Sequence, residues 1–210
     1  MQKIIGFIAL IGIAIGIAWW SMKSQDEAQQ ADAVSSDPLK VGFVYLTNPG
    51  DHGWTYAHEV GRQDLQAHFG DKIETNFVEN VAEGPDAARV IRELVEQGNE
   101  VIFTTSFGYM DPTLKVSKEF PNVKFHHITG YKRSENMATG NIRFYEGRYV
   151  QGVVAGLMTK TNKIGYLGAF PIPEVIQGIN AFASGLRSVN KEASISVVWV
   201  NSWYDPVKES

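Results

Sequence analysis

The sequence of 210 residues contains no cysteine. It therefore forms no disulfide bond, offers no thiolate to a metal and holds no thiol nucleophile. Acylation of an N-terminal lipoprotein cysteine is excluded for the same reason. Charge is modest as well: the formal net charge is -4, and no basic stripe follows a predicted helix, so we expect no nucleic-acid partner.

Motifs of catalysis and cofactor binding are also missing. No serine has a G-x-S-x-G context, and neither of the glycine-rich phosphate-binding patterns occurs. His52 and His58 are six residues apart, which is not the spacing of ligands on one helix face. His126 and His127 are adjacent on a predicted strand and point to opposite faces, and His68 is solitary. We therefore expect no metal, no cofactor and no enzymatic activity.

A long apolar run lies near the N-terminus, from Ile4 to Trp20. Its length is close to the lower limit for spanning a bilayer, about 17 to 25 residues. A small-x-small site at residues 31–33 would allow cleavage of a signal peptide, although it lies far from the run. Residues 1–23 are thus predicted to be either a cleaved signal peptide or a retained anchor, and both export the remainder. Residues 24–38 are small and polar, as in a flexible tether.

The segment from Lys40 to Phe69 organises the rest of the chain. An apolar run at 41–46 predicts a strand, a polar loop follows at 48–53, and apolar residues then recur at helical spacing. The helical stripe consists of Trp54, Ala57, Gly61, Leu65 and Phe69. This is the first half of a βαβ unit.

Strands and helices continue to alternate downstream. We predict strands at 72–79, 101–105, 123–128, an edge strand ending through Phe144, and strands at 164–170 and 194–200. We predict helices from 84–86, from Pro112, over 146–159 and over 174–189, and a helix start at Asp205-Pro206. Such alternation with short connections predicts an α/β fold with doubly wound parallel sheets.

The chain divides into two predicted lobes. We interpret residues 39–160 as a first ligand-binding lobe and residues 161–210 as the incomplete start of a second. The helix over 146–159 should bury an apolar stripe, and its glycines should allow close packing on another element. The stripe is Val150, Val153, Val154, Leu157 and Met158, and the glycines are Gly147, Gly152 and Gly156.

Aromatic residues follow four of the predicted strands. They are Trp54, Phe107 with Tyr109, Phe170, and Trp203 with Tyr204. Open α/β sheets bind ligands beyond the carboxyl ends of their strands, and small-molecule sites are mostly apolar. Any one of these side chains could instead cover the sheet edge as part of the core. Four at corresponding positions favour a site for a flat ligand.

Polar residues near these aromatics could hydrogen-bond to the edge of such a ligand. They are Asp51, Asp111, Asn201 and Asp205. Asp111 precedes Pro112 and is better explained as a helix N-cap. Asp51 fits a cap and a ligand group equally well. Glu146 begins a helix, where the dipole favours an acid, so we expect a structural role.

Five segments carry a resemblance to a known family: KVGFVY, GDHGWTYAHEVGR, EGPDAARVIRELVEQGNEVIFTTSFGYMDP, FYEGRYVQGVVAG and FPIPEVIQGINAFASGLRSVN. From Lys40 onwards the chain resembles the basic membrane protein family of ABC-transporter substrate-binding proteins, in the branch of purine nucleoside receptors. The resemblance implies a type I periplasmic-binding-protein-like fold, with a ligand trapped between two lobes. It also implies an extracytoplasmic location, an ABC permease as partner, and a second lobe completed by sequence that this chain lacks.

The resemblance assigns roles to several residues. Asp51 matches the acidic residue of the first ligand loop, and Trp54 takes the place of a phenylalanine that stacks on the base. Thr55 stands where asparagine is common, and Phe107 matches an aromatic after the third strand. Thr129-Gly130 replaces a common Asp-Gly, which removes a carboxylate. We therefore expect a preference for a nucleobase such as adenine over a nucleoside.

Other functions stay open at this level. A membrane-tethered sensor would use the same binding site without feeding a transporter. A nucleoside-processing enzyme could share the fold, but the sequence offers neither a nucleophile nor a metal site. A repressor core would need DNA-binding helices where this chain has its hydrophobic segment.

Overall fold

The computed structural model describes residues 37–50, 52–203 and 205–210. The predicted export segment, most of the predicted tether, Asp51 and Tyr204 lie outside the described residues. Among the helices that are described, none combines the length and the apolar character needed to cross a bilayer.

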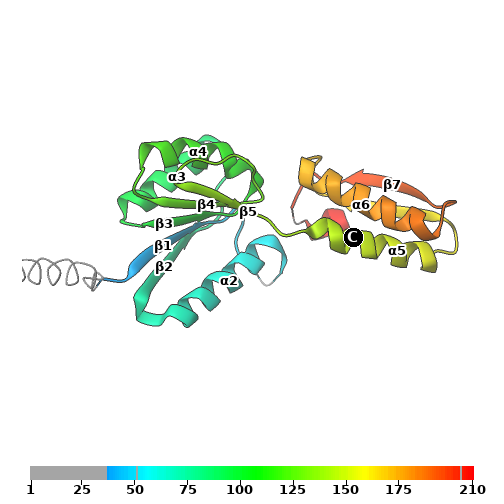
Figure 1. Cartoon of the computed structure of the whole chain (residues 1–210), viewed down its shortest axis with the longest axis horizontal. Coiled ribbons are helices and arrows are strands. Elements are labelled where there is room, and N and C mark those ends of the chain that lie inside the picture. Colours follow the sequence, from blue (N-terminus) through cyan, green and yellow to red (C-terminus); the bar gives the residue numbers. More distant parts are fainter. Residues whose placement is uncertain (1–36, 51, 204) are drawn as a thin grey trace, which may run out of the picture. The chain divides into compact units, whose positions relative to one another are not determined.

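The first lobe is built on a parallel sheet whose five strands, within the described residues, run in the order β2-β1-β3-β4-β5. These strands are β1 (Leu39–Val44), β2 (Ile73–Val78), β3 (Val101–Thr104), β4 (Lys124–Ile128) and β5 (Met137–Gly140). The connecting helices are α2 (Gly53–Phe69), α3 (Pro85–Glu96) and α4 (Met110–Glu119). Figure 1 shows α2 on one face of the sheet and α3 with α4 on the other. The predicted α/β fold with a doubly wound parallel sheet is confirmed.

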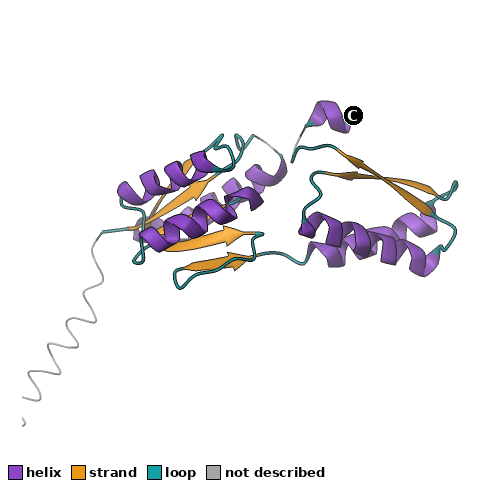
Figure 2. Cartoon of the chain, turned by 90° about the horizontal axis from the view of Figure 1, so that it is seen from above, coloured by secondary structure: helices purple, strands orange, loops and turns teal. Residues whose placement is uncertain are grey.

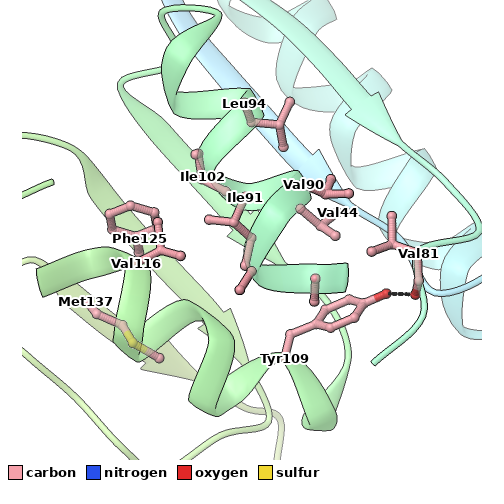
Figure 3. Close-up of a cluster of buried hydrophobic side chains, with 12 residues drawn as sticks. Val44, Val81, Val90, Ile91, Leu94, Ile102, Tyr109, Val116, Phe125 and Met137 are labelled. Carbon is pink, nitrogen blue, oxygen red and sulfur yellow. Dashed lines mark hydrogen bonds between the residues drawn. The ribbon is translucent and has the colours of Figure 1, made fainter. Parts of the chain in front are cut away.

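The main core of this lobe lies beneath α3 and α4 (Figure 3). Ile91 and Leu94 of α3 meet Ile102 of β3, and all three side chains are buried. Burying one such side chain contributes about 1.5–3 kcal/mol. The strong apolar face of α3 therefore fixes this helix on the sheet.

The opposite face, under α2, has a small apolar cluster of Val41, Phe43 and Tyr45, against which Leu65 of α2 packs. Polar side chains add to this contact. Glu59 is buried and pairs with Arg62 at 2.6 Å, while the hydroxyl of buried Tyr45 donates to Glu59 at 3.2 Å. Arg62 also donates to Thr75 of β2 at 2.7 Å. The hydrogen bond from Arg62 lowers the pKa of Glu59. The predicted helix is confirmed, but only part of its apolar stripe is covered: Phe69 is exposed, and the buried residues of the helix are Thr55 and Glu59.

The elements after β5 are α5 (Phe144–Met158), β6 (Lys163–Gly168), α6 (Pro173–Val189), β7 (Ser194–Trp199) and α7 (Pro206–Glu209). Strands β6 and β7 pair in parallel, and α5 packs along α6 (Figure 2). A Cβ atom on Gly152 would overlap the carbonyl oxygen of Phe182, and one on Gly185 would overlap that of Tyr149. Glycine is therefore required for this close contact of two helices.

Two expectations, about the start and the apolar stripe of α5, were wrong. Its first residue is Phe144, which the sequence placed in an edge strand, because β5 ends at Gly140. The stripe predicted to be buried is largely exposed in the described chain, with Leu157 at 69% and Met158 at 74%. The face of α5 that carries Gly152 and Gly156 packs on α6. The apolar stripe therefore points away from α6.

Of the three glycines, Gly147 has open space around it rather than a packed neighbour. Since α5 packs on α6, we infer that the second lobe begins before α5 and not at residue 161.

The glycine contact between α5 and α6 gives a paired test. Gly152→Ala places a methyl group against the backbone of α6 and should lower the midpoint of thermal unfolding. Gly147→Ala meets no neighbour and should stabilise the helix by about 0.5–1 kcal/mol through backbone entropy. Thermal denaturation followed by circular dichroism compares the two. Equal stability of both variants would contradict the described packing.

Buried His127 makes stability depend on pH. Its side chain is fully buried on β4 and bonds Thr104 at 2.9 Å, and burial lowers its pKa from 6.5 to about 4. Between those values the unfolded chain binds a proton that the folded chain does not. Folding stability should therefore fall as the pH drops from about 6.5 to about 4, by on the order of 3 kcal/mol from this group.

Urea unfolding at a series of pH values measures this effect. The variant His127→Gln should show a shallower loss of stability over the same range, because the other histidines remain. Identical slopes in the two proteins would show that His127 does not carry the effect.

Candidate functional site

The loops that follow β2 and β3 are tied together at the carboxyl edge of the first sheet. One carboxylate oxygen of Glu83 accepts hydrogen bonds from the hydroxyl of Ser106 at 2.5 Å and from the backbone N–H of Gly108 at 2.9 Å. A Cβ atom on Gly108 would overlap the Glu83 carboxylate. Phe107 therefore lies between two residues that Glu83 holds in place.

Tyr109 completes this tie but does not face the site. Its side chain is fully buried, and its hydroxyl donates to the carbonyl of Val81 at 2.6 Å (Figure 3). Burial raises its pKa. The structure thus places Tyr109, at the end of a short 3₁₀ turn over 107–109, in the core of the lobe. Tyr109 is absent from the described lining of the hollows at this edge, which corrects its prediction as a ligand-binding residue.

Trp54 connects the first turn of α2 to the loop after β3. Its indole N–H donates to the carbonyl of Thr105 at 2.5 Å, and its ring meets His58 edge-on at 4.7 Å between centroids. Burial lowers the pKa of His58. The orientation of the indole is therefore set by a hydrogen bond at one edge and by the imidazole of His58 at its side.

Trp54 and Phe107 line the same hollow. Its described lining also includes Ser106, Thr129, Glu174 and Trp203. A second hollow beside it is lined by Trp54, Thr55, Trp203, His52 and residues 46–50. The structure therefore brings together Trp54, Phe107 and Trp203, which the sequence placed after three different strands.

Thr129 is in a strained part of this lining. Its φ angle is +72°, a left-handed conformation that is uncommon for a β-branched residue. Its backbone N–H donates to the carbonyl of Gly140 at 2.8 Å. Behind it, a Cβ atom on Gly130 would overlap the ring of His127. Strain of this kind persists where surrounding structure holds it, often at functional sites.

The other predicted site residues lie near the hollow or outside it. Thr55 is buried and its hydroxyl shares a hydrogen bond with Thr47 at 2.8 Å. Phe170 packs against Trp203 with 5.2 Å between ring centroids. Asp51 lies outside the described residues. That these side chains bind a ligand stays a prediction.

The structure tests the roles predicted for three acidic residues, Asp111, Asp205 and Glu146. Asp111 is not an N-cap: a short 3₁₀ turn moves the start of α4 to Met110, and Asp111 pairs with Lys132 at 2.6 Å. Asp205 does cap α7, since its side chain accepts from the N–H of Lys208 at 3.1 Å. Glu146 is exposed and pairs with Arg143 at 3.2 Å.

Two acidic residues of this region were missed from the sequence. Glu83 stands just before the Gly-Pro start of α3, and Glu174 stands in the first turn of α6, after a Pro-Ile-Pro run. Both positions look like ordinary helix starts, where acids are common. One feature of the sequence could have identified both residues: Glu83 and Glu174 each follow a parallel strand after a short loop. Among the described residues, no group of three metal-ligating side chains is placed to hold an ion.

Comparisons with known proteins identify the family. Residues 39–210 match the Bmp family model, described as ABC transporter substrate-binding protein PnrA-like. A purine-binding protein of Brucella abortus is 58% identical over 178 residues, which cover 85% of this chain and 51% of that protein. A Haloferax volcanii protein, whose name assigns it to glucose binding by an ABC transporter, is 44% identical over 170 residues, covering 81% and 43%.

A solved structure shows the fold. The solute-binding protein of an ABC transporter system from Aeropyrum pernix matches with a TM-score of 0.69 at 18% identity, over 81% of this chain and 50% of that one. The chain spans about half the length of the curated relatives it matches. The family match extends over both lobes and confirms the resemblance found in the sequence. The chain therefore belongs to the Bmp family of PnrA-like ABC transporter substrate-binding proteins.

Proposed function

We propose that this protein is the extracytoplasmic substrate-binding component of an ABC importer. It captures a purine base or nucleoside between two lobes and presents it to a membrane permease, without chemical turnover. The observation that carries the proposal is the hollow shared by Trp54, Phe107 and Trp203. The relative in Brucella abortus that is named as a purine-binding protein supports the choice of ligand.

Aromatic stacking supplies the affinity in this account. The ring of Phe107 and the indole of Trp54 offer flat apolar surfaces, and stacking of a base on an aromatic side chain contributes about 1–3 kcal/mol. Both rings are held before the ligand arrives, by Glu83 on one side and by the carbonyl of Thr105 on the other. Little further ordering is then needed on binding, which favours affinity.

The preference for a free base rests on Thr129. A carboxylate at this position would accept hydrogen bonds from sugar hydroxyl groups, whereas threonine carries no charge. The left-handed backbone of Thr129 is one that Asp and Asn adopt more easily. Threonine at this position therefore carries an energetic cost.

A sugar is the second candidate ligand. It is favoured by the relative in Haloferax volcanii named for glucose binding. Aromatic faces stack on sugar rings as well, but sugars also need several hydrogen-bonding partners around their hydroxyl groups. Aromatic rings make up half of the described lining of the hollow, and the hydroxyl of Ser106 is already donated to Glu83, which favours the purine.

Isothermal titration calorimetry of the protein produced from the complete gene tests the ligand class. Adenine should bind in the micromolar range or tighter, adenosine more weakly, and glucose without measurable heat. Clearly tighter binding of adenosine would overturn the preference for a base. Binding of glucose without binding of either purine would overturn the purine proposal as a whole.

Removing the Glu83 tie should weaken binding without unfolding the protein. Glu83→Ala frees Ser106 and Gly108, so Phe107 loses its fixed orientation, and we expect adenine affinity to fall about ten-fold. Glu83→Gln keeps an acceptor oxygen and should retain most of the affinity. The same titration measures both variants, with thermal midpoints recorded alongside.

Glu93→Ala is a matched control, because Glu93 is an exposed acid on α3 that pairs with Arg89 away from the hollow. It should leave adenine affinity unchanged. Unchanged affinity in Glu83→Ala would show that the tie does not position the ring.

A further inference from the structure

Glu174 brings a carboxyl group into the aromatic hollow. It lies in the first turn of α6, directly after Pro173, and is half-buried. Its partners in the lining include Trp54, Phe107 and Trp203. We propose that Glu174 is the specificity-determining residue of this site and accepts hydrogen bonds from an amino group on a planar heterocyclic ligand. The proposal rests on the proposed purine-binding function and refines it.

The other polar groups that line the hollow are less able than Glu174 to select a ligand by charge. The indole N–H of Trp54 is already donated to Thr105, and the hydroxyl of Ser106 is already donated to Glu83. Thr129 offers a neutral hydroxyl. Among the described residues that line the hollow, Glu174 alone is ionisable. A ligand stacked on the rings therefore meets one group whose charge can select its hydrogen-bonding edge.

The chemistry of a carboxylate decides which edge is selected. An ionised carboxylate accepts hydrogen bonds and donates none, so it favours ligand N–H groups and disfavours ligand carbonyl oxygens. Hydrogen bonds to a charged group are stronger than those between neutral groups. The structure therefore favours aminated planar heterocycles, such as adenine, over related rings without an amino group.

Burial supports the same assignment. Desolvation raises the pKa of Glu174, and a hydrogen bond from Asn141 partly opposes this rise. A half-buried carboxylate in an apolar setting is costly unless donors surround it. The amino group of a bound ligand would supply such a donor when water leaves the hollow.

The test compares two ligands that differ in one group, adenine and unsubstituted purine, by calorimetric titration of the protein produced from the complete gene. The wild-type protein should bind adenine about ten-fold more tightly than purine. Glu174→Met removes the acceptor at similar length and should bring the two affinities within about two-fold. Glu174→Gln keeps a neutral acceptor and should retain part of the preference.

Gln177→Met is the matched control, since Gln177 is an exposed residue on the same helix and is absent from the described lining of the hollow. It should leave the ratio of the two affinities unchanged. An undiminished preference for adenine in Glu174→Met, or equal affinities in the wild type, would overturn the role of Glu174 while purine binding stands. Failure of the wild type to bind either ligand would instead overturn the proposed function, and this inference with it.

Discussion

Parallel pairing of β1 with both of its neighbours is the constraint on which the site depends. Val44 at the end of β1 is in register with Val78 of β2 and Thr104 of β3, so the three strands end at one level. Hydrogen bonds continue past the strands: the N–H of Tyr45 donates to Val78, and that of Thr105 donates to Val44. The loops that carry the functional side chains therefore leave the sheet side by side.

Side-chain hydrogen bonds then fix the orientation of the aromatic residues that these loops carry. Glu83 holds the residues on both sides of Phe107, and the carbonyl of Thr105 holds the indole of Trp54. These contacts involve loops that are distant in sequence, so each ring is oriented by a different segment of the chain. The stacking surfaces that the first lobe contributes to the hollow are consequently arranged before a ligand binds.

Much of the first lobe could be predicted from its sequence, because its strands and the helix α3 have strong periodic patterns. The aromatic residues after the strands were also evident, and Trp54, Phe107 and Trp203 do meet around one hollow. Tyr109 could not be separated from Phe107 by sequence, since the short turn between them decides which ring enters the core. Glu83 and Glu174 were hidden because acids at helix starts are ordinary.

The errors on the helices have a common physical origin. The sequence of α5 is apolar enough to suggest a buried stripe, yet Gly152 and Gly156 allow backbone contact with α6, and that contact decides the orientation of the helix. In α2 the buried positions are occupied by Thr55 and Glu59, because an ion pair and a tyrosine satisfy the carboxylate. The periodicity of a sequence shows which face of a helix is apolar. Close packing of glycines and ion pairing of charged residues decide which face is buried.

A crystal structure of the complete protein grown with adenine tests the central claim most directly. Our account predicts a planar ligand stacked against Trp54 and Phe107, inside the hollow that these side chains share. Density for the ligand outside this hollow, or rings of Trp54 and Phe107 that make no contact with it, would contradict the account.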